Sequence, residues 1–117
     1  MFNWLKPKTE MYIEQLASFD YSQLELEYAY KKSGGKNNTV ISEQEMVKVV
    51  FENNNPHDSN AVAVYAYNLK IGYIPSCDAR KVRRMIHPIV SLRLYYYNEK
   101  YRAEVTIEYN GLKKEKK

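Results

Sequence analysis

The sequence predicts one small domain of the α+β, mainly β class: an antiparallel, highly curved sheet or small barrel with two helices. The chain has 117 residues, enough for one domain with its own core and too few for two. Several segments alternate apolar and polar residues with the period of two that is typical of half-exposed strands. Parallel pairing needs long crossovers, and only one predicted helix is placed to supply one, so we expect antiparallel strands.

The first third of the chain is predicted to hold a helix and then a strand. Thr9 can cap a helix over residues 10–18, because Leu16 and Phe19 belong to an approximate helical stripe. From Leu24 to Tyr30 the period changes to two, which indicates a strand with one wet face. A polar, glycine-containing loop follows. We therefore expect an N-terminal helical segment over residues 1–20 that packs on a β-domain over residues 21–110.

The middle of the chain predicts three strands and a helix. Residues 46–51 form a strand pattern, and a polar corner follows it. Residues 61–67 are apolar on both faces, so we expect them to form a central strand. Residues 70–74 are a short strand that can pair back as a hairpin. Pro75 ends this strand, and a helix is expected over residues 76–86, where Ser76 or Asp78 can cap its start and Pro88 forbids its continuation.

The end of the chain predicts a long β-hairpin and a basic tail over residues 111–117. Two alternating runs, residues 89–97 and 100–109, surround a two-residue turn. A register that pairs Leu94 with Ala103 puts both apolar sets on one face of the sheet, and a slip by one residue would bury charged side chains. The opposite face then pairs Arg93 with Glu104 and Tyr95 with Arg102.

Composition narrows the functional classes. The single cysteine, Cys77, cannot form an internal disulfide and fits a reducing compartment. No apolar run approaches the ~20 residues that span a membrane, and the start lacks the apolar core of a secretory signal. We therefore expect a cytoplasmic protein. The formal net charge of +4 permits a phosphate-bearing partner without demanding one. Twelve tyrosines provide stacking faces with hydrogen-bonding tips, most of which we expect to lie in half-buried strands.

No constellation in the sequence supports catalysis. His57 precedes an aspartate, but the chain has only one other histidine, His87, so a metal site built on this pair lacks ligands. Cys77 and His87 lie ten residues apart across a predicted helix, which separates them by about 15 Å, far beyond hydrogen-bond reach. There is no glycine-rich phosphate loop and no Cys/His spacing for zinc. We expect no enzymatic activity, no metal and no cofactor.

The polar corner NPHDSN, residues 55–60, allows two interpretations. As a turn, Pro56 presets the backbone, and the Asp58 carboxylate accepts the backbone N–H of Asn60 in an Asx turn. In the other interpretation, Asp58 faces an open cleft beside His57 and contacts a ligand.

Two motifs at the right separation make the chain similar to the HIRAN domain family. They are NPHDSNAVAV, residues 55–64, and KIGYIP, residues 70–75, followed by a helix; the resemblance covers about residues 46–87. It implies a small barrel related to the OB-fold. It also implies a module that captures the 3′ end of single-stranded DNA, since the best-understood members do so. Members that are fused to helicase and nuclease modules suggest such proteins as partners.

The resemblance places Asn55, His57 and Asp58 at the terminal nucleotide. A carboxylate repels phosphates, but it can accept a hydrogen bond from a free 3′-hydroxyl, so Asp58 would distinguish a strand end. His57 stands where the family has an aromatic residue and can stack on a base. The implied first-strand aromatics are Tyr28 and Tyr30. Candidate phosphate contacts on the helix after Pro75, which can equally be a solvated helix face, are Arg80, Arg83 and Arg84.

A protein-interaction module on the same fold is the alternative function. Family members that bind DNA have an arginine on the first strand, and here that stretch carries Glu25 and Glu27 instead. Two carboxylates on this strand have the wrong sign for a phosphate backbone. They favour a module that keeps the fold and contacts protein.

Overall fold

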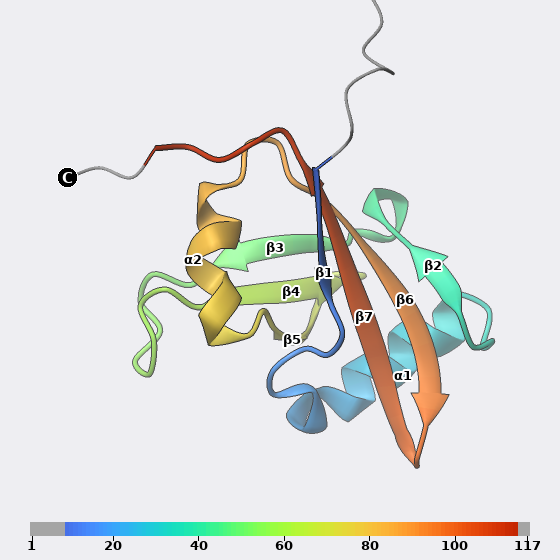
Figure 1. Ribbon diagram of the computed structural model, residues 1–117. Coiled ribbons are helices and arrows are strands. Elements are labelled where there is room, and N and C mark those ends of the chain that lie inside the picture. The colour runs from blue at the N-terminus through green and yellow to red at the C-terminus, as the bar shows by residue number, and fades with distance from the viewer. Residues whose placement is uncertain (1–8, 115–117) are drawn as a thin grey trace, which may run out of the picture.

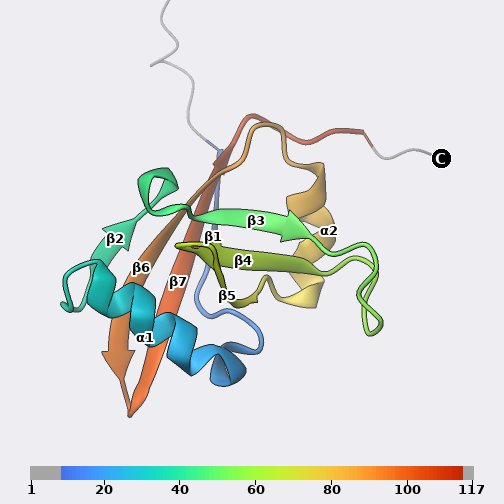
Figure 2. The same cartoon turned by 180° about the vertical axis from the view of Figure 1, so that it is seen from behind.

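The computed structural model describes residues 9–114 and shows two antiparallel β-sheets with two α-helices (Figures 1 and 2). The mainly β class with antiparallel sheets is confirmed. The first sheet has the order β1-β7-β6-β2 and the second β3-β4-β5. In chain order the strands are β1 (Thr9–Ile13), β2 (Thr39–Ile41), β3 (Lys48–Phe51), β4 (Val62–Ala66), β5 (Leu69–Tyr73), β6 (Ile89–Tyr97) and β7 (Lys100–Tyr109). The helices are α1 (Gln23–Lys32) and α2 (Ser76–Arg84), with the short 3-10 turns η2 (Phe19–Ser22) and η3 (Glu43–Glu45).

The predicted N-terminal helix over residues 10–18 is wrong, because residues Thr9–Ile13 form the edge strand β1. β1 pairs antiparallel with β7, with Ile13 opposite Val105. Leu16 and Phe19 are buried as the sequence pattern suggests, but they lie in the loop and the turn η2 after β1 instead of in a helix; Ile13 of β1 is buried as well. The strand that pairs with this segment and makes it a strand is β7, which lies about ninety residues further along the chain. Residues 1–8 of the predicted N-terminal segment lie outside the described residues.

The predicted strand from Leu24 to Tyr30 is also wrong, because these residues lie in the helix α1. Apolar residues at every second position share a strand face, but in a helix they point in different directions. Leu26 is fully buried against the core, whereas Leu24 is 79% exposed. The side chain of Gln23 anchors the helix start, because it hydrogen-bonds to both the backbone N–H and the carbonyl of Tyr101 on β7.

The predicted β6–β7 hairpin is confirmed in its bounds and its register. Leu94 pairs with Ala103 and Arg93 with Glu104, and Tyr95 lies opposite Arg102. The apolar face is buried, while Arg93 and Glu104 form an ion pair of 2.5 Å on the other face. The expectation of a central strand is confirmed as well, since β4 lies between β3 and β5.

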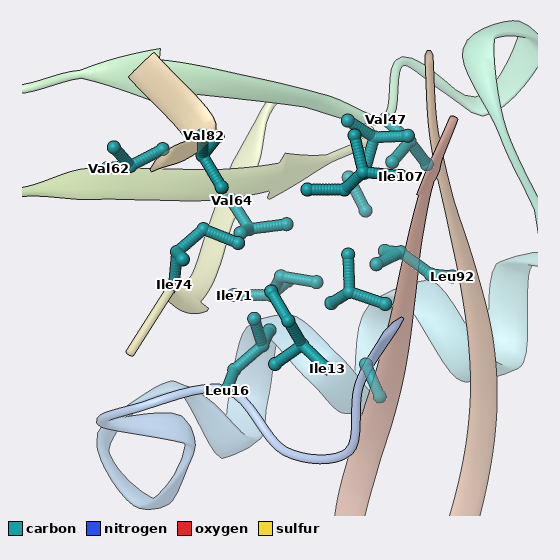
Figure 3. Packing of buried hydrophobic residues seen from close by; sticks show 14 of the residues in the cluster. Ile13, Leu16, Val47, Val62, Val64, Ile71, Ile74, Val82, Leu92 and Ile107 are labelled. Atoms are coloured by element: carbon teal, nitrogen blue, oxygen red, sulfur yellow. The ribbon is translucent and has the colours of Figure 1, made fainter. Parts of the chain in front are cut away.

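The core lies between the two sheets (Figure 3). Leu92 and Ile107 project from β6 and β7, and Val64 and Ile71 project toward them from β4 and β5; all four are fully shielded from solvent. Val82 of α2 covers the β4 side of this core. Helix α1 packs across β7, β6 and β5 at another edge of the molecule. No helix in the part of the chain that the structure describes is long and apolar enough to cross a membrane.

The two sheets meet where the chain leaves β1. Ala17 and Tyr73 exchange both backbone hydrogen bonds, at 2.8 and 2.9 Å, so the segment after β1 also pairs with β5. Within residues 9–114, no strand ladder joins β2 to β3, which are linked through η3. The strand pairing therefore does not confirm a closed barrel related to the OB-fold, and that detail stays a prediction.

The described part of the predicted basic tail returns to α2. Leu112 bridges to Met85, and the N–H of Lys113 donates to the carbonyl of Arg84 at 2.7 Å. Residues 115–117 of the tail lie outside the described residues. The bounds of the predicted tail and domain stay predictions.

Candidate functional site

Two side chains shape the polar corner between β3 and β4. The side-chain oxygen Oδ1 of Asn55 accepts the backbone N–H groups of His57 and Asp58, at 2.8 and 3.1 Å. Oδ1 of Asp58 accepts the N–H of Asn60 at 2.9 Å, so the Asx turn expected from the sequence is confirmed. The N–H of Ala61 returns to the carbonyl of Asp58 and closes the corner. Local hydrogen bonds thus impose the shape that the NPHDSN pattern predicts.

Arg83 of α2 attaches the end of the corner to the helix. Its guanidinium donates to the backbone carbonyls of Ser59, Asn60 and Ala61, at 3.2, 2.9 and 3.0 Å. It also donates to the Asn53 side chain at 2.7 Å and lies 4.8 Å from the centre of the Phe51 ring. The planar fork of an arginine suits several acceptors at once. The sequence predicts that Arg83 contacts phosphate, but in the structure its guanidinium holds the corner in place.

A pocket of about 380 Å³ opens beside the corner. Three predicted site residues line it together, namely Asn55, His57 and Asp58. Its volume lies within the range of about 300–1,000 Å³ that is usual for ligand sites. The remaining walls come from the segment after β1, from the residue before β4, from the end of β5 and the residue after it, and from the start of α2: Ala17, Ser18, Ala61, Tyr73, Ile74 and Ser76.

Asp58 both builds the turn and lines the pocket; contact with a ligand stays a prediction. One carboxylate oxygen maintains the turn through the N–H of Asn60. Among the described residues no group donates to the other oxygen, Oδ2, and the side chain lines the pocket beside His57. A carboxylate has four lone-pair sites, so Asp58 keeps acceptor capacity for a ligand.

The structure does not bring the predicted tyrosines to this pocket. Tyr28 packs edge-to-face on Tyr67, with ring centres 6.2 Å apart, at the turn between β4 and β5. Tyr30 packs on Tyr101, at 5.2 Å, and donates to the Asn37 side chain. The β4–β5 turn lies at the end of β4 opposite the corner, as Figure 2 shows. The stacking role predicted for these two residues depended on a first strand that is in fact α1.

The other two predicted arginines lie on α2, outside the pocket lining. Arg80 is exposed, and Arg84 donates from Nε to the carbonyl of Lys113 at 2.9 Å. The basic cluster that the sequence predicts therefore divides: Arg83 holds the corner, Arg84 contacts the C-terminal segment and Arg80 faces solvent on the helix.

A polar network that sequence reasoning missed connects the two motifs. The Tyr73 hydroxyl donates to Oε1 of Glu52 at 2.7 Å, and the Asn55 side chain donates to the same oxygen at 3.0 Å. The Lys70 ammonium contacts Oε2 of Glu52 at 2.6 Å and the Tyr73 hydroxyl at 2.9 Å. Tyr73 belongs to the KIGYIP motif, so the separation of this motif from the corner in the sequence could have indicated that Tyr73 lies close to the corner. Glu52 carried no such signal in the sequence, because its partners lie up to 21 positions away.

Opposing effects set the ionisation of this network. Partial burial raises the pKa of the Glu52 carboxyl, but hydrogen bonds from Lys70, Tyr73 and Asn55 together lower it, so the net pKa lies below the ordinary value. The hydrogen bonds to Glu52 and Tyr73 raise the pKa of Lys70 against the effect of desolvation. Glu52 is thus a carboxylate, and Lys70 an ammonium, at neutral pH.

The variant Glu52→Gln is expected to lose stability at pH 7 and to lose less at pH 3.5. A carboxyl whose pKa is lowered by folding stabilises the protein above its ordinary pKa, near 4.5, and this contribution is lost as the pH falls through the folded value. Urea unfolding of both proteins at the two pH values measures the difference. The matched control is Glu99→Gln in the exposed β6–β7 turn, which removes the same charge outside this network. An unchanged gap for Glu52→Gln would contradict the expectation.

Comparison with known proteins adds one match. The family description "HIRAN domain" matches residues 16–112, a span that contains the corner, the pocket and the polar network. No curated protein and no solved structure matches the chain. Within residues 9–114, no three side chains of His, Cys, Asp or Glu gather in a way that could hold a metal ion.

Proposed function

The chain belongs to the HIRAN domain family, and from this membership and the pocket we propose a non-catalytic module that binds the 3′ end of single-stranded DNA. The family itself suggests binding of nucleic acid. One observation carries the finer proposal: the Asp58 carboxylate lines the pocket with one oxygen engaged by the protein and the other available. An internal phosphodiester offers a carboxylate no donor, whereas the terminal deoxyribose offers a 3′-hydroxyl.

The surrounding groups suit a terminal nucleotide. His57 is exposed beside Asp58 and can stack on the base, and the half-buried Tyr73 provides a second ring in the same pocket. Ser76 lines the pocket at the first residue of α2. The positive end of that helix dipole would favour the phosphate that precedes the terminal sugar. Asn55 acts through the backbone, since its amide oxygen holds the N–H groups of His57 and Asp58.

The distribution of charge supports binding of an anionic strand outside the pocket. The net charge is +4, and α2 carries four of the cations, including the exposed Arg80. Arg84 is half-buried beside the C-terminal segment, where further lysines follow. In the cell, a helicase or nuclease partner would supply free ends to such a module.

Fluorescence anisotropy with two oligonucleotides tests the proposal. They share one single-stranded sequence and differ only in a free 3′-hydroxyl or a 3′-phosphate. The protein should bind the hydroxyl form more tightly, and binding of both should weaken as salt rises, because phosphate contacts release counterions. Equal affinity for the two ends would contradict end recognition. No binding at low salt would contradict the whole proposal and favour the protein-interaction alternative.

Arg83→Lys is expected to weaken binding of the 3′-hydroxyl oligonucleotide about tenfold without changing its salt dependence. A lysine keeps the charge but cannot reach the three carbonyls and the Asn53 side chain together, so the corner loosens. The measurement is the slope of log affinity against log salt. The control is Arg80→Gln: loss of a phosphate contact there lowers the slope by about 1. Unchanged affinity for Arg83→Lys would contradict the role of Arg83 in holding the corner.

A further inference from the structure

Helix α1 and the turn before it expose an apolar stripe, of which Tyr67 in the β4–β5 turn covers only a part, at Tyr28. The stripe consists of Tyr21 in the turn η2 and of Leu24 and Tyr28, which are four residues apart and share one face of α1. Their exposed fractions are 90%, 79% and 48%. The opposite face of α1 is fully buried through Leu26 and Ala29. Single exposed apolar residues are ordinary, but a contiguous stripe is typical of an interaction surface.

Charges are distributed unevenly along this stripe. At its start Glu25 lies in the first turn of α1, while Asp20 of η2 is paired with Lys100. At its end Lys32 lies in the last turn, next to Lys31, which is paired with Glu27. Lys32 lies beside the stripe, since its ammonium is 5.9 Å from the centre of the Tyr28 ring. Glu25 precedes Lys32 by seven residues, which is two helical turns, so both border the same side of the stripe.

We propose that this stripe binds a second copy of the chain, with the two α1 helices antiparallel about a two-fold axis. In that symmetry, one side of the stripe meets the same side of the other copy in reverse order. Glu25 of each copy then approaches Lys32 of the other, while Leu24 and Tyr28 exchange apolar contacts. The helix dipoles also oppose each other. A parallel arrangement would instead bring the two Glu25 side chains to one end of the helix pair and the two Lys32 side chains to the other.

The size of the surface predicts a weak, concentration-dependent dimer. A ten-residue helix is about 15 Å long, so the pair buries an area at the low end of specific interfaces. None of the three stripe residues lines the pocket beside the corner. Dimerisation is therefore independent of the proposed DNA binding, and variants in the stripe leave the pocket residues in place.

Sedimentation equilibrium of the full chain from about 1 to 500 µM tests the proposal, since weak interfaces dissociate in this range. The wild type should pass from the monomer mass of 13.9 kDa toward twice that value. Leu24→Glu should raise the dissociation constant at least about tenfold, because it places two carboxylates in an apolar contact. Glutamate is a good helix former and Leu24 is exposed, so the variant should fold, which circular dichroism checks.

The matched control is Val40→Glu on the edge strand β2, where the replaced side chain is 64% exposed. It should leave the mass unchanged. A monomer at every concentration would overturn the proposal. So would association that Val40→Glu abolishes and Leu24→Glu leaves intact, because that result assigns the contact to a sheet edge.

Charge reversal tests the orientation of the two helices. Glu25→Lys and Lys32→Glu should each weaken dimerisation several-fold, since each places like charges opposite one another. The double variant should recover dimerisation, because opposite charges then face each other again with their positions exchanged. Absence of recovery, with helicity of the double variant intact, would overturn the antiparallel pairing.

Discussion

Replacement of Asp58 by asparagine is expected to abolish the preference for a 3′-hydroxyl over a 3′-phosphate. Asparagine keeps an oxygen that can accept the N–H of Asn60, so the turn remains. The other carboxylate oxygen is replaced by an amide NH2 group, which is a donor and cannot accept a hydrogen bond from the 3′-hydroxyl. A hydrogen bond to a charged group contributes about 1.5–3 kcal/mol, so affinity for the hydroxyl end should fall about 10- to 100-fold. Competition anisotropy with the two oligonucleotides measures this change.

Two further variants separate ligand contact from scaffold. Asp58→Ala removes both oxygens, so it should lose end preference and also thermal stability, whereas the asparagine variant should lose only the former. Asp78→Asn, in the first turn of α2 but outside the pocket lining, should keep the preference. If the asparagine variant discriminates the two ends as the wild type does, Asp58 belongs to the scaffold alone.

Replacement of Gly72 by alanine is expected to destabilise the fold by about 3 kcal/mol, a combination of overpacking and backbone strain. A Cβ at this position would lie 2.9 Å from the Cβ of Leu16 and 3.0 Å from the carbonyl oxygen of Ala17. The backbone also adopts a φ of 155°, which side chains disfavour. The melting temperature should fall by about 10 °C or more, as thermal unfolding followed by circular dichroism would show.

Gly34→Ala is the control that isolates the steric contact. Gly34 also has a positive φ, 125°, but an added Cβ there would have no atom within 4 Å. Its cost is therefore the backbone strain alone, and Gly72→Ala should be clearly more destabilising. Equal losses would contradict a close approach at Gly72. Because Ala17 and Tyr73 both line the pocket, that approach also sets how near the segment after β1 comes to β5.

The local pattern of apolar and polar residues was sufficient to predict the structure where only one arrangement of the strands buries the apolar side chains. The β6–β7 hairpin allows a single register that keeps Leu94 and Ala103 inside and Arg93 with Glu104 outside. The same pattern gave the wrong prediction between Leu24 and Tyr30. There, apolar residues at every second position fit a strand, but Leu26, Ala29 and Tyr30 also fit the inner face of a helix. The contact of α1 with β7, through Gln23 and Tyr101, decides between the two.

The candidate site likewise has one part that follows from the local sequence and another that depends on distant contacts. The sequence by itself determined the turn at Asp58, because a hydrogen bond between near neighbours builds it, and the resemblance to the family suggested that Asn55, His57 and Asp58 lie together. Only the tertiary structure decided that Arg83 holds this corner, that Tyr73 and Glu52 join it, and that Tyr28 and Tyr30 lie elsewhere. Those placements depend on contacts between positions roughly 20 to 80 residues apart, and no local pattern of residue types records which distant partners the packed core brings together.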